Sequence, residues 1–207
     1  MFQAIIAGIF LGLGLGLITG PIFFALVQTS IQYSRKKAIH LGAGIWLSDV
    51  LYVSILLFFS SYIDESLHWD HPIIRILSLI GGAVIMSVGI HFLVQRFRRS
   101  KDKVIPLSGN SFLLFSKGFA INTFNPFTLF FWIGLITGSK LGADYSFQQL
   151  LVLCFMLILT IIVGDNIKIY YAERIGHIIH SKWKNRLETL TGLIFLGFGI
   201  YLIYLAF

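Results

Sequence analysis

Residues 11–28 read LGLGLGLITGPIFFALVQ, an apolar run that Pro21 interrupts near its centre. Residues 118–138 read GFAINTFNPFTLFFWIGLITG and place Pro126 at a corresponding point in the second half of the chain. Proline removes a backbone donor and clashes with the preceding helical turn, so a lipid-embedded helix tolerates it only where other groups satisfy the freed carbonyls. Broken helices repeated in two halves are typical of substrate sites in secondary transporters.

The composition around these runs predicts an integral membrane protein. Of 207 residues, 57% are hydrophobic and only 12% are charged, and the mean hydropathy is +0.84. Soluble domains of this size are less apolar and more charged. The single cysteine, Cys154, lies in the apolar run LVLCFMLIL and is interpreted as a packing residue.

Each transmembrane helix needs about 20 apolar residues, which gives six candidate spans in this chain. They are residues 3–30, 38–60, 72–95, 118–138, 147–170 and 189–206. The N-terminal stretch has no basic segment and no small-residue cleavage site before Gln28, so we expect it to be retained as a helix. The predicted fold class is therefore all-α, a polytopic membrane protein with six transmembrane helices.

Basic residues collect in alternate loops, which predicts the orientation of the chain. The acidic second loop has only Arg75 at its edge, and the fourth has only Lys140. The first, third and fifth loops hold Arg35, Lys36, Lys37, Arg96, Arg98, Arg99, Lys101, Lys103, Lys117, Arg174, Lys182, Lys184 and Arg186. By the positive-inside rule these loops face the cytoplasm and both termini lie outside it. The net charge of +7 thus has a topological explanation, and we expect no nucleic-acid partner.

Six spans divide into two repeats of three, residues 1–105 and 106–207, and an odd number per repeat means that the second inserts upside down. The third span contains GGAVIMSVGI and the sixth contains TGLIFLGFGI, which align Gly82 with Gly192 and Gly89 with Gly199. The first spans of the two repeats share the proline break, and the second spans each carry one aspartate. These matches predict two inverted three-helix repeats with broken first helices in one membrane domain.

The break in the first span predicts half of a substrate site. A half-helix that begins at Gly20 and Pro21 would direct the N–H groups of Ile22 and Phe23 into the membrane, about 15 Å deep at a rise of about 1.5 Å per residue. Such helix ends attract anions, and a substrate carboxylate is the expected ligand.

The break in the fourth span predicts the other half. A half-helix that begins at Asn125 and Pro126 would present the N–H groups of Phe127 and Thr128 at a similar depth. Asn122 and Asn125 share a helix face and could cap this helix or bind substrate. For either break the alternative is a proline kink that serves packing alone.

Asp49 and Asp165 are the candidates for proton coupling. An ionised carboxylate deep in a bilayer costs at least about 2.5 kcal/mol, so each needs a partner, a proton or water. Burial disfavours the charged form, which would let either aspartate bind and release a proton or pair with a substrate ammonium. Lys168 follows Asp165 by three residues, so these two could instead form a structural ion pair.

Taken together, these positions resemble the lysine exporter and homoserine/threonine efflux family (LysE/RhtB). That family has six spans, a first-span Pro-Gly-Pro signature, a Gly-rich second span that ends in an acidic residue, and a fourth-span Asn-Pro motif. The corresponding segments here are Thr19-Gly20-Pro21, SRKKAIHLGAGIWLSD ending at Asp49, and FSKGFAINTFNPF with Asn122, Asn125 and Pro126. Thr19 replaces the first proline of the signature, and Phe127 stands where the family usually has lysine.

The resemblance implies an exporter of amino acids or related small metabolites in the bacterial cytoplasmic (inner) membrane, driven by protons and needing no cofactor. It implies no enzyme activity. No Walker-type glycine loop is present, which agrees with transport that does not use a bound nucleotide. Membrane lipids, protons and the substrate are the expected partners, and the glycine-rich third and sixth spans leave a homo-oligomer open.

Three alternatives compete with this interpretation. A metal or other cation exporter could use the same scaffold, although carboxylate and cysteine ligands are sparse within the spans. An intramembrane aspartyl protease also needs two facing aspartates, but Gly164-Asp165 lacks the Gly-x-Gly-Asp pattern. A purely structural membrane protein would not need paired broken helices at matching depth.

Overall fold

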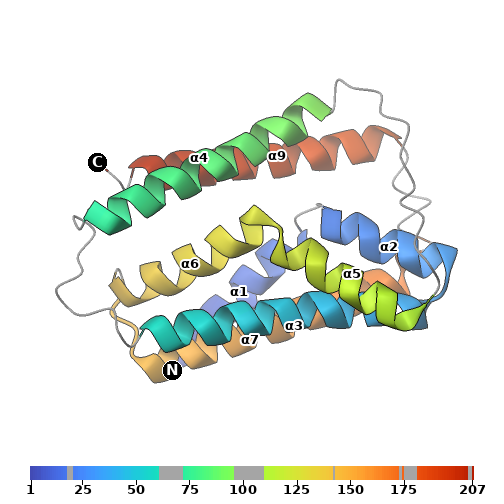
Figure 1. Ribbon diagram of the computed structural model, residues 1–207, viewed down its shortest axis with the longest axis horizontal. Helices are drawn as coiled ribbons and strands as arrows, with labels where there is room; N and C mark the ends of the chain where they lie inside the picture. The colour runs from blue at the N-terminus through green and yellow to red at the C-terminus, as the bar shows by residue number, and fades with distance from the viewer. Residues whose placement is uncertain are drawn as a thin grey trace.

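The computed structural model describes residues 1–17, 21–60, 72–95, 110–141, 143–172, 174, 181–204 and 207. The regular elements of this part of the chain are α-helices, arranged along one long axis (Figure 1). They are α1 (Phe2–Leu17), α2 (Pro21–Gln32), α3 (Arg35–Ser60), α4 (Pro72–Gln95), α5 (Ser111–Thr123), α6 (Pro126–Leu141), α7 (Phe147–Tyr170) and α9 (Ser181–Tyr204).

The helix starts follow from local sequence signals. Pro occupies the first position of three helices, where its missing N–H costs no hydrogen bond. Asn110 accepts the Phe112 N–H at the start of α5, and Ser146 and Gln149 form a reciprocal capping box at the start of α7. The three proline starts are Pro21 of α2, Pro72 of α4 and Pro126 of α6.

The helices overlap the predicted spans, although α5 begins seven residues and α9 eight residues earlier than predicted, and some of them satisfy the length and hydropathy needed to cross a membrane. Arg35–Ser60 and Phe147–Tyr170 are long and apolar enough, and the bent pair Ser111–Thr123 and Pro126–Lys140 passes the same test when taken as one span. The other predicted spans contain shorter apolar helices, Phe2–Gly16, Ile22–Gln32, Ser78–His91 and Phe195–Tyr204. The chain is thus a helical protein of membrane type, and the count of six spans stays a prediction.

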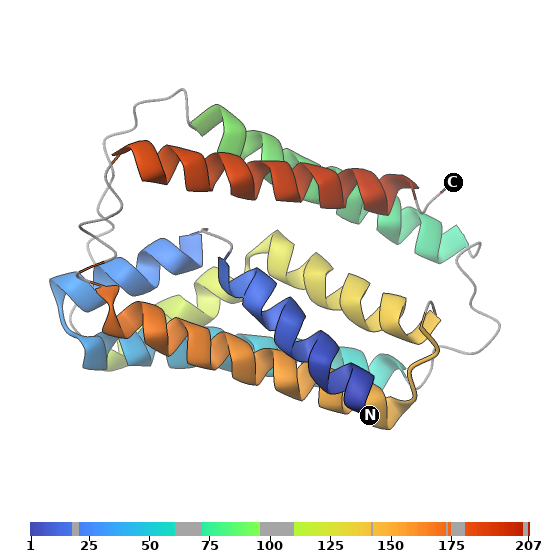
Figure 2. The same ribbon diagram turned by 180° about the vertical axis from the view of Figure 1, so that it is seen from behind.

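The expected break in the fourth predicted span falls where the sequence places it, and α2 begins at the expected proline. α5 ends at Thr123, α6 begins at Pro126, and the two axes differ by 59°. α1 ends at Leu17 and α2 begins at Pro21, while residues 18–20 lie outside the described part of the chain. The starts of α2 and α6 both lie near the middle of the long axis, on the side that faces α4 and α9 (Figures 1 and 2).

The helices pack in pairs that the two halves of the chain supply jointly. α1 lies along α7 and α5 lies along α3, while α4 and α9 form a separate layer over the others (Figures 1 and 2). In the two halves of the chain, α1 corresponds to α5, α3 to α7 and α4 to α9. When each helix is replaced by its counterpart, the α1–α7 pair therefore becomes the α5–α3 pair, and the α4–α9 pair becomes itself. Both chain termini lie at one end of the long axis, and α3 and α5 begin at the other (Figure 1).

The glycines of α4 and α9 face each other. A Cβ atom at Gly82 would lie 2.8 Å from the Gly199 carbonyl oxygen, and a Cβ at Gly199 would lie 2.8 Å from that of Gly82. Gly89 and Gly192 make the same reciprocal approach, at 2.9 and 3.0 Å. Only glycine allows backbones this close, so the four glycines that align between the two halves of the sequence serve contact between the third and sixth predicted spans.

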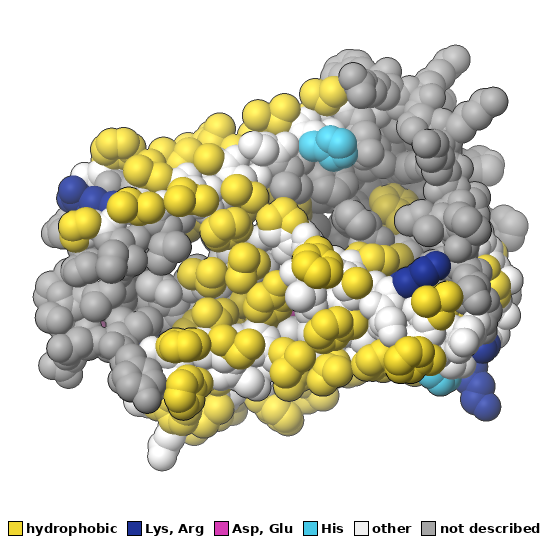
Figure 3. Space-filling view, in the orientation of Figure 1, with side chains coloured by type: hydrophobic (Ala, Val, Ile, Leu, Met, Phe, Trp, Pro, Cys, Tyr) yellow, Lys and Arg dark blue, Asp and Glu magenta, His cyan; other side chains and the backbone are white. Residues whose placement is uncertain are grey.

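Apolar side chains fill the interior and also cover much of the described surface. One cluster of the core surrounds Trp132, Leu150 and Leu157, and it contains Cys154, which confirms the packing interpretation of that cysteine. On the face shown in Figure 3, hydrophobic side chains cover the middle of the described surface, and Lys and Arg lie toward the ends of the long axis. An apolar surface of this kind is what a membrane protein presents to lipid.

Candidate functional site

A buried hydrogen-bond network surrounds Asp49, at the point where α3 passes the break between α5 and α6. The Asp49 side chain is 6% exposed, and its Oδ1 accepts N–H donors from Asn122 Nδ2 at 2.9 Å and Trp132 Nε1 at 3.0 Å. Asn122 belongs to α5 and Trp132 to α6, so one carboxylate oxygen contacts both half-helices. These two donors replace part of the hydration that burial removes from the carboxylate.

Asn122 is held by further hydrogen bonds. Its side-chain nitrogen also donates to the Ile45 carbonyl at 3.1 Å, and its Oδ1 accepts the Thr128 hydroxyl at 2.9 Å. Asn122 is 1% exposed, so each of its polar atoms needs a protein partner, and each has one. The structure thus brings together two of the predicted site residues, Asp49 and Asn122, from different halves of the chain.

The end of α5 is fixed to α3 by two more contacts beside this network. Ser48 and Thr123 share a hydrogen bond of 2.8 Å between their hydroxyls, and the Tyr52 hydroxyl donates to the Thr123 carbonyl. Thr123 is the last residue of α5, where carbonyl groups lack helical partners. Tyr52 therefore satisfies one of the carbonyls that the break releases.

Asn125 acts as the cap of α6. Its Oδ1 accepts the Phe127 N–H at 3.1 Å, so this N–H of the predicted anion-binding end already has a protein partner. Of the two roles expected for the asparagines, Asn125 shows the capping geometry and Asn122 contacts the aspartate. Direct binding of substrate by Asn125, Pro126 or Asn122 stays a prediction.

The first break is described from Pro21 onward, and Gly20 lies outside the described residues. Ile22 packs against the cluster that includes Leu26 and Ile45, whereas Phe23 is buried with Val27 and Ala172. The predicted role of Gly20, Pro21, Ile22 and Phe23 in binding a carboxylate stays a prediction.

Asp165 forms the ion pair that its spacing from Lys168 suggests. Its Oδ1 lies 2.9 Å from Lys168 Nζ, and its Oδ2 accepts the Trp46 indole N–H at 3.0 Å. Asp165 is 2% exposed, and Lys168 Nζ lies 5.9 Å from the centre of the Phe23 ring. The carboxylate is thus paired and hydrogen-bonded, as a buried charge must be.

We expect this pair to couple strongly in stability measurements. Lys168→Met leaves the buried Asp165 charge without its cation and should destabilise the folded protein by about 3–5 kcal/mol, whereas Asp165→Asn leaves the partly exposed Lys168 unpaired and should cost less. The double variant leaves no unpaired charge, so it should unfold at a higher temperature than either single variant. Thermal unfolding of the four proteins in detergent measures this coupling, and additive single effects would show that the pair contributes no interaction energy.

Sequence reasoning did not predict the side-chain hydrogen bonds that Trp46, Thr128 and Trp132 make in these networks, nor those of Ser48, Tyr52 and Thr123 beside them. Trp46, Thr128 and Trp132 each donate to a polar side chain of the site, and Trp132 is 1% exposed. For the two tryptophans a signal was available, because the N–H of a buried Trp usually has a hydrogen-bond partner. The signal was weak because aromatic residues make up 15% of the chain.

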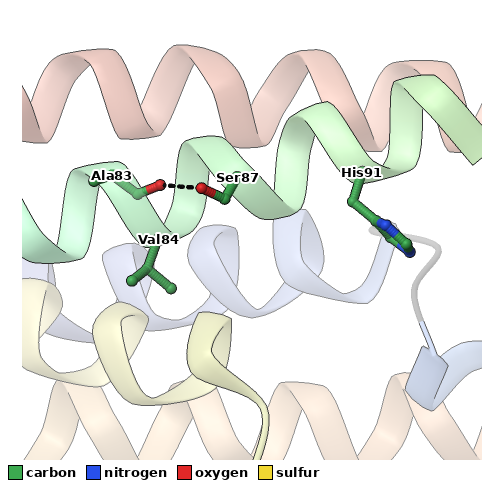
Figure 4. A pocket seen from close by; sticks show the side chains of 4 residues that line it. All are labelled: Ala83, Val84, Ser87 and His91. Atoms are coloured by element: carbon green, nitrogen blue, oxygen red, sulfur yellow. Dashed lines mark hydrogen bonds between the residues drawn. The ribbon is translucent and has the colours of Figure 1, made fainter.

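A surface hollow of about 380 Å³ lies on α4, lined by Ala83, Val84, Ser87 and His91 (Figure 4). The Ser87 hydroxyl donates to the carbonyl of Ala83 in its own helix, at 2.8 Å. None of the residues that hydrogen-bond to Asp49 or Asp165 line this hollow. The buried hydrogen bonds, and not the size of a cavity, therefore locate the candidate site.

Comparison with known proteins finds relatives that cover most of the chain. Similar proteins include an amino acid efflux protein, YcgF, of Bacillus subtilis (strain 168), 27% identical over 200 residues that cover 95% of this chain and 93% of that protein. The threonine efflux protein of Escherichia coli (strain K12) is 26% identical over 193 residues, 89% of each chain. The Salmonella typhimurium threonine efflux protein is 25% identical over 194 residues, also 89% of each. No solved structure matches the chain significantly. The family model described as LysE type translocator matches residues 13–206, and the chain therefore belongs to the LysE type translocator family.

Proposed function

We propose that this protein exports amino acids across the cytoplasmic membrane and couples their movement to protons. The observation that carries the proposal is the buried Asp49, which contacts both half-helices of a broken span through Asn122 and Trp132. A carboxylate in that position can bind a proton or a substrate ammonium, and it lies where a change in the break would alter its surroundings. The related efflux proteins named above support amino acids as the substrate class.

The pairing of helices supports a two-repeat arrangement of the membrane domain, with residues 1–105 and 106–207 inserted in opposite directions. α1 packs on α7 as α5 packs on α3, and the α4–α9 pair is self-equivalent when the halves are exchanged. The glycine contacts show the same symmetry. Gly82 aligns with Gly192 and Gly199 with Gly89, so the contact between Gly82 and Gly199 corresponds to the contact between Gly192 and Gly89. In such a transporter the halves rock about a site near the middle of the membrane.

In this mechanism the half-helix starts at Pro21 and Pro126 hold the substrate carboxylate, and Asp49 carries the coupling proton. Asp165 is a weaker proton carrier, because Lys168 and Trp46 already occupy both of its oxygens. The positions of the chain ends support termini outside the cytoplasm, since they lie opposite the basic start of α3 (Figure 1).

The cation-exporter alternative has less to support it. Among the described residues, no three His, Cys, Asp or Glu side chains cluster in a way that could hold a metal ion. The relatives named above are efflux proteins for threonine or amino acids. We therefore do not propose metal-ion export, and gradient-driven movement of a metal ion in the transport assay would contradict amino-acid export.

The test is export from vesicles of known orientation that are preloaded with labelled amino acids, threonine among them. We expect an imposed pH gradient to accelerate the loss of at least one amino acid roughly tenfold over vesicles without the protein, because proton flow would drive the cycle. A proton ionophore should abolish the acceleration. No movement of any amino acid, with gradient-driven movement of a metal ion instead, would contradict the proposal.

A further inference from the structure

Asp49 uses its two carboxylate oxygens differently. Oδ1 accepts both the Asn122 and Trp132 donors, and no described residue hydrogen-bonds to Oδ2. Every fully buried side-chain nitrogen or oxygen in the described part of the chain has a hydrogen-bond partner. Within the described part of the chain, Oδ2 is therefore the carboxylate oxygen of Asp49 that has no hydrogen-bond partner.

The orientation of the Asn122 amide produces this difference. Its nitrogen faces two acceptors, Asp49 Oδ1 and the Ile45 carbonyl. A reversed amide would place an oxygen against those two oxygens and lose both bonds, so only one orientation is compatible with the site. That orientation leaves Asn122 Oδ1 in need of a donor, and the Thr128 hydroxyl supplies it at 2.9 Å.

Building on the proposed function, we propose that Thr128 is a positioning residue for Asp49. Its hydroxyl holds the Asn122 amide so that Oδ1 of Asp49 stays engaged, which makes Oδ2 the oxygen that takes up the proton or the substrate ammonium. The bond also spans the break, because Asn122 is the second-last residue of α5 and Thr128 the third of α6. A change in the bend between these helices would move Thr128 relative to Asn122 and so alter the donors around Asp49.

The test compares Thr128→Val, which removes the hydroxyl at nearly constant volume, with Thr128→Ser, which keeps it. We expect Thr128→Val to lower the maximal gradient-driven export rate roughly tenfold, the scale of one buried hydrogen bond, and to displace its pH profile from that of the wild type. Thr128→Ser should keep the wild-type pH profile and a rate within about twofold of it.

The matched control is Thr29→Val. Thr29 is fully buried, but its hydroxyl donates to the Ala25 carbonyl of its own helix and does not contact the Asp49 network. A structural role for Thr128 alone would lower the amount of folded protein without moving the pH profile. If Thr128→Val does not accumulate in membranes, Thr128→Ala removes the same hydroxyl without adding volume, and the same profile is measured.

The outcomes separate this inference from the proposed function. A wild-type rate and pH profile for the variants that lack the Thr128 hydroxyl would overturn the positioning role, even where Asp49→Asn is inactive. Failure of Thr128→Ser to restore the profile would overturn it as well. Full gradient-driven export by Asp49→Asn would instead overturn the proposed function itself.

Discussion

Asp49→Asn is expected to abolish gradient-driven export while leaving the protein folded. An asparagine Oδ1 can still accept the Asn122 and Trp132 donors, so the buried network survives the substitution. The charge and the exchangeable proton are lost, and we expect export to fall roughly 100-fold or more, the scale on which loss of a proton-transferring group slows a reaction. Export per unit of folded protein, in vesicles with an imposed pH gradient, measures the effect.

A second assay distinguishes the two roles open to Asp49. Exchange of labelled for unlabelled amino acid across the membrane requires substrate binding but no net proton movement. If the Asp49 carboxylate carries only the proton, Asp49→Asn should retain exchange. If the carboxylate also binds the substrate ammonium, Asp49→Asn should lose exchange as well. Asp144→Asn makes the same chemical change at an exposed loop position and should transport normally. Unaltered gradient-driven export by Asp49→Asn would show that the carboxylate has neither role.

Alanine at Gly44 or Gly118 is expected to destabilise the packing that forms the site. A Cβ at Gly44 would fall against the Phe115 carbonyl oxygen and lie 2.7 Å from the Phe119 nitrogen, and a Cβ at Gly118 would fall against the Leu41 carbonyl oxygen. The atoms that each added Cβ would contact belong to the backbone and cannot rotate away. α3 and α5 would therefore have to separate, which should lower the free energy of unfolding by about 1–3 kcal/mol for each substitution. The thermal unfolding midpoint in detergent should fall accordingly.

The control for these variants is Gly138→Ala in α6, where an added Cβ meets nothing within 4 Å. There alanine should leave stability unchanged or raise it by about 0.5–1 kcal/mol, since glycine is the poorer helix former. Since α3 carries Asp49 and α5 carries Asn122, we also expect Gly44→Ala and Gly118→Ala to reduce export in the fraction that folds. Equal unfolding midpoints for Gly44→Ala, Gly118→Ala and Gly138→Ala would contradict the close packing of α3 on α5.

The helix breaks could be predicted because proline acts on its own turn. Pro126 begins α6 after a bend of 59°, and Pro21 begins α2, as the sequence indicated. The spacing between Asp165 and Lys168 is equally local, and the pair forms at 2.9 Å within one helix. The function of Asn125 was left open between capping and binding, and the structure shows the cap.

By itself, the sequence determined the class of this protein, its helix breaks and the two buried aspartates, because hydropathy, proline and ionisable residues act through local chemistry. Tertiary structure alone decided which groups surround Asp49, since Asn122 and Trp132 lie 73 and 83 residues away along the chain. It also decided that the glycines of α4 contact those of α9. Such contacts depend on how helices pack side by side, which no short segment of sequence specifies.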